Sequence, residues 1–235
     1  MDKEPQDLQN SERDELSETQ KKQIEDMYTA IGVVHRKAIA EDYDGFDGRD
    51  VIEINKSVLE SDFLLNPHLY GQLRKRNVSI VSTVNGQRRE SSVKPIDAKE
   101  LPYIYMDFSK NLKEKTSKIS SSSSVGEVLD TAAWAHIELI RIHPFLEGNG
   151  RTARLMVDLI FARADLLYIT DWGSRDREYI ETVYQTHKQK KPKIFKLFLA
   201  NKLRKSINEL GRVGSGVADY VSNTREQVDL YIEDL

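Results

Sequence analysis

The sequence of 235 residues contains no cysteine and no long apolar run, and each absence restricts what the chain can be. Without cysteine there are no disulfides and no thiolate metal site, which fits a reducing compartment. No apolar run reaches the ~20 residues that a membrane-spanning helix needs. The N-terminal residues are charged rather than apolar, so no signal peptide is expected. We therefore expect a soluble, cytoplasmic protein without membrane contact, while delivery into another cell by an uncleaved signal stays open.

A strong charge of one sign is also missing, because the net charge is only −3. The chain as a whole therefore has no electrostatic attraction to nucleic acid, and we expect none as a partner. One short basic run, His187 to Lys196, departs from this balance. It is read either as a nucleic-acid patch or as solvated surface, and its shortness favours the second. The acidic loop from Glu41 to Arg49 lacks the spacing of a calcium-binding loop and is also read as solvated.

Most of the chain has the apolar spacing of amphipathic helices. Helices are expected over residues 24–40, 51–65, 101–115, 124–142, 151–166, 175–188 and 194–210. Ser124 and Glu127 have the spacing of a capping box at the start of the fourth of these helices. Residues 155–167 are apolar almost all round, which predicts a buried helix. The glycines from Gly211 to Gly216 predict a break before a separate tail.

The stretch HPFLEGNGRTAR, from His143 to Arg154, joins two of these helices and concentrates residues that carry chemistry. Gly148 and Gly150 allow the backbone to turn sharply and to approach a ligand closely. The first turn of the following helix leaves backbone N–H groups without intrahelical partners, and the helix dipole adds positive charge there. Together these features predict a phosphate-binding loop.

The charged and titratable side chains of this stretch fit nucleotide chemistry. Arg151 and Arg154 share a helix face and suit a polyphosphate. Glu147 is the one carboxylate beside the expected phosphates and is a natural Mg²⁺ ligand. His143 titrates near neutrality and could accept a proton from an attacking hydroxyl. Asp158, four residues after Arg154, is expected to pair with it.

The same stretch matches, position for position, the HPFx(D/E)GNGRxxR signature of Fic-domain proteins. It resembles the branch that transfers AMP from ATP, since the Doc-like kinase branch differs in the glycine turn. The resemblance covers about Val51 to Leu203. It implies an all-α, Fic-type helical core at 51–210 with a β-hairpin flap. Residues 1–50 then form an N-terminal tail and helix. Residues 211–235 form a C-terminal tail, which is a candidate for a regulatory segment.

The resemblance also implies a role for each residue of the loop. His143 is the general base, and Glu147 holds Mg²⁺ between the phosphates of ATP. The phosphates are cradled by Gly148, Asn149 and Gly150 and neutralised by Arg151 and Arg154. Phe145 is expected to pin the loop to the core. Tyr179, on a later helix, is placed near adenine by the resemblance, and a core tyrosine is the alternative.

A β-hairpin is predicted at about 78–94, where two β-branched or extended runs flank Asn85-Gly86, the sequence of a type I′ turn. The Gly71 to Val78 lead-in resembles the family's approach to its active-site flap. By that resemblance the hairpin covers the site, and it docks the target segment by strand addition along Val78, Ser79, Ile80 and Val81. A purely structural hairpin is the alternative.

Many Fic proteins are inhibited by a helix with an (S/T)xxxE(G/N) motif, whose Glu competes with the nucleotide for the second motif arginine. Ser222 to Glu226 fits all but the last position, where Gln227 stands, so Glu226 is the inhibitory candidate. Ser11 to Glu15 fits equally well and is followed by Leu16. Otherwise the inhibitor is absent or is a separate small protein.

The resemblance thus implies a nucleotidyltransferase that moves AMP to a Ser, Thr or Tyr hydroxyl of a target protein, with self-modification included. The sequence names neither the target nor the oligomeric state. Two alternatives remain at this point. One is another transfer at the same site: UMP, phosphocholine, phosphate, or removal of AMP. The other is a non-catalytic module that binds nucleotide or peptide, against which the intact His143 argues.

Overall fold

The computed structural model describes residues 17–67, 70–84, 87–90, 94–169, 171–172, 177–213 and 215–235. In chain order the elements of this part of the chain are α1 (Glu18–Ala38), α2 (Gly48–Ser57), α3 (Glu60–Leu65), β1 (Val81–Val84), β2 (Gln87–Glu90), α4 (Leu101–Thr116), α5 (Val125–Ile142), α6 (Asn149–Arg163), α7 (Arg177–Gln189), α8 (Pro192–Val213), η1 (Ser215–Val217) and α9 (Ala218–Asp234). The fold is thus a helical assembly, and none of these helices is long and apolar enough to cross a membrane.

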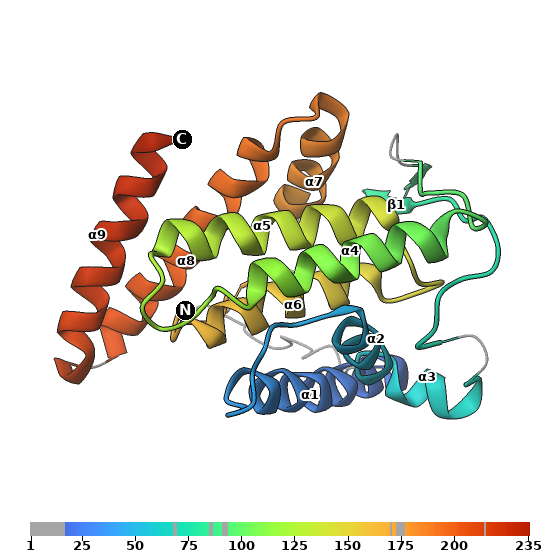
Figure 1. The fold of residues 1–235 in the computed structure, drawn as a ribbon, viewed down its shortest axis with the longest axis horizontal. Helices are drawn as coiled ribbons and strands as arrows, with labels where there is room; N and C mark the ends of the chain where they lie inside the picture. Colours follow the sequence, from blue (N-terminus) through green and yellow to red (C-terminus); the bar gives the residue numbers. More distant parts are fainter. Residues whose placement is uncertain are drawn as a thin grey trace, which may run out of the picture.

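The helices α5 and α6 pack against each other at the centre of the molecule (Figure 1). On one side α6 is covered by α1 and α2, and on another α5 is covered by α4 and α8. The helix α7 packs on α8 and α5, and α9 packs on α8 and α5. The loop between α5 and α6 is the stretch singled out in the sequence, so it is held between the two central helices.

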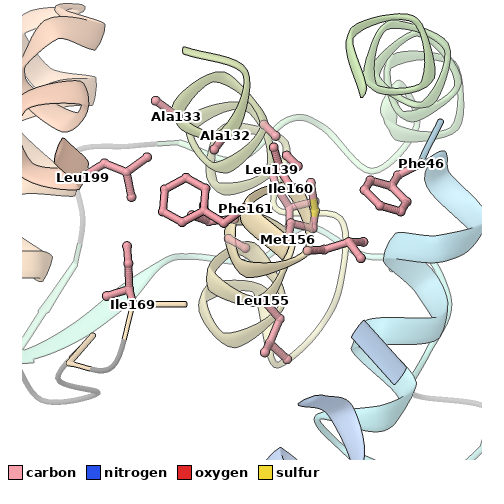
Figure 2. Packing of buried hydrophobic residues seen from close by; sticks show 14 of the residues in the cluster. Phe46, Ala132, Ala133, Leu139, Leu155, Met156, Ile160, Phe161, Ile169 and Leu199 are labelled. Atoms are coloured by element: carbon pink, nitrogen blue, oxygen red, sulfur yellow. The ribbon is translucent and has the colours of Figure 1, made fainter. Parts of the chain in front are cut away.

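The burial of α6 follows from its composition, as the sequence predicts. Leu155, Met156, Val157 and Phe161 are each at most 2% exposed, and they point in several directions around the helix. Figure 2 shows Phe161 directed toward Leu199, while Phe46 lies on the opposite side of the same helix. A helix that is apolar on every side gains most when it is enclosed by other helices, and α6 is enclosed in this way.

Two helix starts are fixed by capping boxes. At α5, Ser124 accepts a hydrogen bond from the backbone of Glu127, whose carboxylate accepts one from the Ser124 N–H, so the predicted box is confirmed. At α2, Asp47 and Asp50 make the same reciprocal pair. The acidic loop before α2 therefore ends in a cap, which gives Asp47 a structural role.

Several expected boundaries are wrong. The helix expected over 24–40 begins earlier, at Glu18, and ends at Ala38. The helix expected over 51–65 is two helices, α2 and α3, separated at Val58 and Leu59. The helix after the loop begins at Asn149 rather than Arg151, because Gly148 takes the left-handed conformation that ends the turn. The helix α8 continues through Gly211 to Val213, so the break comes later than the glycines indicate. Gly211 lies against the next helix: a Cβ there would stand 3.1 Å from Val221 Cγ1.

The strands β1 and β2 pair antiparallel, with Val81 opposite Glu90 and Val84 opposite Gln87. The predicted Asn85-Gly86 turn lies outside the described residues, as do residues 91–93. The strands are shorter than the runs expected from the sequence, since residues 78–80 lead into β1 without pairing. Figure 1 draws β1 at the end of α5 that leads into the loop.

The C-terminal helix α9 belongs to the same core rather than forming a separate tail. Val221 and Val228 are buried in the main hydrophobic cluster. The Tyr231 hydroxyl donates to Asp130 of α5, and the Gln227 side chain accepts from the Val125 N–H at 3.4 Å. Both of these hydrogen bonds are made to residues in the first two turns of α5.

We predict that Val228→Ala lowers the free energy of unfolding by about 2 kcal/mol, because Val228 is fully buried and the change leaves a cavity. Leu230→Ala is the matched control, since Leu230 is 55% exposed on the same helix and its loss should cost under about 0.5 kcal/mol. Urea unfolding followed by circular dichroism measures both. Equal losses for the two variants would contradict the packing of α9 on the core.

Candidate active site

The loop begins at His143, which ends α5 in a left-handed backbone conformation (φ 50°, ψ 59°). Its N–H still donates to the Leu139 carbonyl at 2.9 Å, so the helix closes normally before the chain turns away. Burial and the nearby Arg74 guanidinium lower the pKa of His143 to about 4. At neutral pH the imidazole is therefore uncharged and is able to accept a proton.

Arg74 is a buried cation, 3% exposed, that holds the start of this loop. Its Nε donates to the His143 carbonyl at 2.8 Å, and its backbone N–H donates to the Pro144 carbonyl at 2.9 Å. The two Nη atoms donate to the carbonyls of Arg76 and Ile96. Arg76 precedes the hairpin and Ile96 follows it. One guanidinium thus ties both roots of the hairpin to the residue that carries the imidazole.

Asn55 of α2 holds the turn at Gly148. It is fully buried, and its Nδ2 donates to the Glu147 carbonyl and to Thr152 Oγ1, both at 3.1 Å. Gly148 has φ 77°, and a Cβ there would stand 2.9 Å from Asn55 Nδ2. Only glycine meets both requirements, the left-handed conformation and the close approach.

The side chain of Asn149 is turned inward. Its Oδ1 accepts from the Phe145 N–H at 3.0 Å, and its Nδ2 donates to the Phe145 carbonyl at 2.9 Å. The amide therefore closes the loop on itself, and the phosphate cradle expected from Asn149 is limited to its backbone N–H. Phe145 is 1% exposed, so it pins the loop to the core as expected.

The two arginines start from adjacent turns of α6 and diverge. Arg151 reaches α2, where its Nη1 donates to the Val58 carbonyl at 2.7 Å. The Arg154 guanidinium lies over the Tyr179 ring, 5.1 Å from its centre. A Cβ on Gly150 would stand 3.6 Å from Arg154 Nη1, which is ordinary contact. The open side of Gly150 is therefore next to a guanidinium.

Tyr179 is 7% exposed and belongs to the core beneath Arg154. Its hydroxyl is 3.0 Å from His136 Nε2, and burial lowers the pKa of His136 well below its usual value. This agrees with the core interpretation of Tyr179. The contact with adenine expected from the resemblance would need a ring face that is more open than this one.

Asp158 does not form the expected ion pair with Arg154. Its Oδ1 accepts from the Ile169 N–H at 3.3 Å and from Trp172 Nε1 at 3.5 Å. Burial raises the pKa of this carboxyl to about 7. The Asp158 side chain thus links α6 to the segment that follows this helix.

Glu147 has an exposed side chain at the outer edge of the loop, beside the first turn of α6. Across the described residues there is no group of three or more His, Cys, Asp or Glu side chains that could enclose a metal ion. A single carboxylate next to an expected phosphate site fits Mg²⁺ that arrives on a nucleotide, because Mg²⁺ keeps water and phosphate oxygens as its other ligands.

Glu226, the inhibitory candidate, lies far from the loop. It is exposed on α9, and its neighbour Gln227 contacts Val125 at the start of α5. Because α5 has 18 residues, its two ends are about 27 Å apart. A carboxylate on α9 therefore does not reach Arg154 in this fold, and the inhibitory role expected for Glu226 is wrong. The other candidate, Ser11 to Glu15, lies outside the described residues.

Two residues of the site, Asn55 and Arg74, were not predicted from the sequence. Asn55 gives a faint signal, because it is a polar residue beside the apolar positions Val51, Ile54 and Val58 of one helix. Arg74 stands in the lead-in to the hairpin, where nothing distinguishes it from its exposed neighbours Lys75 and Arg76.

We predict that Arg74→Gln raises the pKa of His143 toward its ordinary value, because the change removes the cation that disfavours imidazolium. Titration of the imidazole signals by NMR measures this pKa, and the signal missing in His143→Ala identifies the residue. Arg76→Gln is the control, since it removes an exposed guanidinium two residues away. A pKa unchanged by Arg74→Gln would show that Arg74 does not act on the imidazole.

Asp158→Asn should change how stability depends on pH. A carboxyl with a pKa of about 7 when folded and about 4 when unfolded holds an extra proton in the folded state between these values. Its contribution to stability is full below about pH 4 and is lost as the pH rises through 7.

The Asn variant lacks this loss. It should therefore gain about 2 kcal/mol relative to the natural protein between about pH 5.5 and pH 8. Urea unfolding of both proteins at the two pH values measures the gain, and the contributions of the histidines cancel in the comparison. The same difference at both pH values would show that Asp158 is ionised throughout.

Comparison with known proteins places this geometry in a family. Residues 45–161 match the model of the Fic/DOC family. The chain is 29% identical over 116 residues to the protein adenylyltransferase Fic of Drosophila persimilis, a match that covers 49% of this chain and 19% of the relative. It is 27% identical over 139 residues to the protein adenylyltransferase fic-1 of Caenorhabditis elegans, covering 59% and 23%. The chain spans about a fifth of the length of these curated relatives.

Solved structures have the same fold. A fragment of Fic-1 from C. elegans superposes with a TM-score of 0.61 at 22% identity, over 83% of this chain and 52% of that one. A Fic-domain-containing signalling protein from Bacteroides thetaiotaomicron gives 0.58 at 19% identity, over 92% and 73%. The family match covers the loop and its supports, from α2 to α6. The chain therefore belongs to the Fic/DOC family.

Proposed function

We propose that this chain is a protein adenylyltransferase, which transfers AMP from ATP to a Ser, Thr or Tyr hydroxyl of a target protein. The observation that carries the proposal is the pairing of two features in one loop. An uncharged, largely buried His143 lies at one end of the loop, and an open glycine turn at the N-terminus of α6 lies at the other. Relatives that bear the name protein adenylyltransferase support the reaction class.

The phosphates of ATP are assigned to the first turn of α6. Backbone N–H groups at Asn149, Gly150 and Arg151 have no intrahelical partner there, and the helix dipole favours negative charge. Arg154 is next to the open side of Gly150 and supplies a fixed cation to the β- and γ-phosphates. Glu147 is the residue that would hold Mg²⁺, which when bound neutralises part of the phosphate charge.

The transfer is an in-line displacement at the α-phosphorus. The target hydroxyl oxygen forms a bond to this phosphorus, and the bond from the phosphorus to the bridging oxygen of the β-phosphate breaks. Pyrophosphate leaves with that electron pair, and the hydroxyl proton passes to the imidazole of His143. Because the imidazole is uncharged at neutral pH, no prior deprotonation is needed. The loop contributes mainly by positioning and by fixed charge, since hydrogen bonds from Asn55, Arg74 and Asn149 hold it.

The hairpin is assigned as the flap that docks the target. In a two-stranded sheet each strand pairs along one edge, so the other edge of β1 offers backbone groups to an added strand. The proposed docking segment, Val78 to Val81, leads into this edge and ends at the first residue of β1. The contacts of Arg74 with both roots of the hairpin support a fixed position of this segment relative to His143. Because α9 holds Glu226 at the far end of α5, the remaining sources of inhibition are Ser11 to Glu15 or a separate small protein, if the chain is inhibited at all.

We predict that His143→Ala retains ATP binding and loses AMP transfer by about 10²- to 10⁴-fold, the usual contribution of a general base. ATP labelled on the α-phosphate, with Mg²⁺ and a cell lysate, measures transfer to protein bands and to the chain itself. His35→Ala is the control, because His35 is exposed on α1.

The outcomes separate the alternatives. Full activity of His143→Ala would refute its role as the base. Transfer of label only from γ-labelled ATP would assign the protein to the kinase branch, and transfer only from UTP or a phosphocholine donor would change the transferred group. ATP binding without transfer from any of these donors would favour a non-catalytic binding module.

A further inference from the structure

A surface groove runs along the outer face of α5, lined by residues that the proposed reaction does not use. It consists of two adjoining clefts of about 400 Å³ and about 330 Å³. The first is lined in part by Arg141, Lys188 and Lys190, and the second by Lys115, Trp134 and Lys196. Both are lined by Ile137, Glu138 and Pro192, so the two clefts form one groove between α5 and the α7–α8 turn.

The groove has the length of a short extended peptide. Its α5 residues run from Asp130 to Arg141, which is about 17 Å along the helix axis. An extended chain advances about 3.3 Å per residue, so about five residues would fill it. Its middle is largely apolar, because Ile137 and Pro192 line both halves and Glu138, the third residue common to both, is paired with Arg141.

Trp134 shows that the groove does not offer an open aromatic face. Its ring stacks on Phe108, with centres 5.8 Å apart, and the Lys115 ammonium lies 5.2 Å from its centre. A nucleic-acid base would need a free ring face on which to stack. The aromatic ring here is instead a half-buried wall that supports a cation.

The charged rim is positive once its internal pairs are counted. Glu138 is paired with Arg141 at 2.7 Å, and Asp130 is paired with Lys196 at 2.7 Å, so both carboxylates of the lining are neutralised. Lys188 and Lys190 are exposed, and no carboxylate of the described residues lies within ion-pair distance of either. The net charge of the chain is −3, so this positive rim is local.

Lys190 is held at the rim against its backbone preference. It has φ 54° and ends α7 in a Schellman motif, in which the Lys191 N–H donates to the Thr186 carbonyl at 3.1 Å and the Lys190 N–H to the His187 carbonyl at 3.3 Å. Glycine suits this position best, because it carries no Cβ into the left-handed conformation. A lysine at this position places an ammonium group at the rim of the groove, and the strained backbone costs some local stability. Strained residues of this kind are often found at functional sites.

We propose that this groove docks an acidic, extended peptide segment of a partner protein, with one apolar side chain of the peptide over Ile137 and Pro192. Carboxylates of the peptide would meet Lys188, Lys190 and Lys115. The positive rim, the apolar middle and the length of about five extended residues are complementary to such a peptide. A polyphosphate backbone would leave the apolar middle unused. The proposal concerns binding alone and does not depend on AMP transfer.

Fluorescence anisotropy with a synthetic probe tests the proposal. The probe is a labelled peptide of about eight residues, long enough to overhang the groove, with glutamates and aspartates around one leucine. We expect it to bind at low salt more tightly than a peptide with lysine in place of each acid. Replacing its leucine by serine should weaken binding, because the apolar contact is lost.

Variants of the protein locate the binding. Lys188→Glu combined with Lys190→Glu should weaken it by about tenfold or more, and Ile137→Ser should weaken it as well. Lys22→Glu, on an exposed residue of α1, is the charge-matched control for Lys188→Glu and Lys190→Glu made singly, each of which should also weaken binding. Lys190→Gly distinguishes a loss of docking from a loss of folding. The variant protein should have an equal or higher melting temperature, because the backbone strain is relieved. It should nevertheless bind the peptide more weakly, because the ammonium is lost.

Four results would overturn the proposal. The first is equal binding of the acidic and basic peptides. The second is equal weakening by Lys22→Glu, which would reduce the effect to bulk charge. The third is tighter binding of a labelled thymidine oligonucleotide that the same groove variants abolish, which would make the groove a nucleic-acid surface. The fourth is self-association of the natural chain in size-exclusion chromatography that the groove variants abolish, because the occupant would then be a second copy.

Discussion

A loop packed into a protein core must have its backbone polar groups satisfied, and the structure around His143 to Arg154 follows from this constraint. Helices and sheets satisfy their own backbone, but a loop depends on side chains, either its own or those of other segments. Here the Asn55 side chain bonds the Glu147 carbonyl, the Arg74 side chain bonds the His143 carbonyl while its backbone N–H bonds that of Pro144, and the Asn149 side chain bonds both backbone groups of Phe145. The loop is therefore rigid because three buried polar side chains hold it, and apolar packing alone would not give this geometry.

The same burial sets the protonation of the groups around the loop. An uncharged imidazole at His143 and a carboxyl at Asp158 with a raised pKa both reflect the cost of charge in a site with little water. Cations are retained where carbonyl groups or an aromatic ring replace water, as at Arg74 and Arg154. The positive charge beside the glycine turn is thus fixed before a ligand arrives, which is what electrostatic preorganisation requires.

Patterns local in the sequence predicted much of this arrangement. The capping box at Ser124, the burial of α6 and the position of the loop between two central helices all follow from spacings of a few residues. The features that were missed depend on distant contacts. Asn55 bonds residues more than ninety positions away, and Arg74 bonds a carbonyl 69 positions away, so neither leaves a local pattern.

The wrong expectations have the same origin. Asp158 has the spacing to pair with Arg154, but a backbone N–H and an indole on the next segment compete for it. Glu226 fits the inhibitory motif except at its last position, but its helix packs at the wrong end of α5. Spacing along a chain indicates which partners are within reach, and the tertiary fold decides among them.

The left-handed backbone at residue 143 restricts which amino acids can replace the histidine. Among ordinary residues, asparagine, aspartate and histidine enter this conformation most readily, and of these only histidine is a base near neutral pH. Evolution therefore has little freedom at this position: the backbone and the chemistry each exclude most amino acids, and histidine is what both allow.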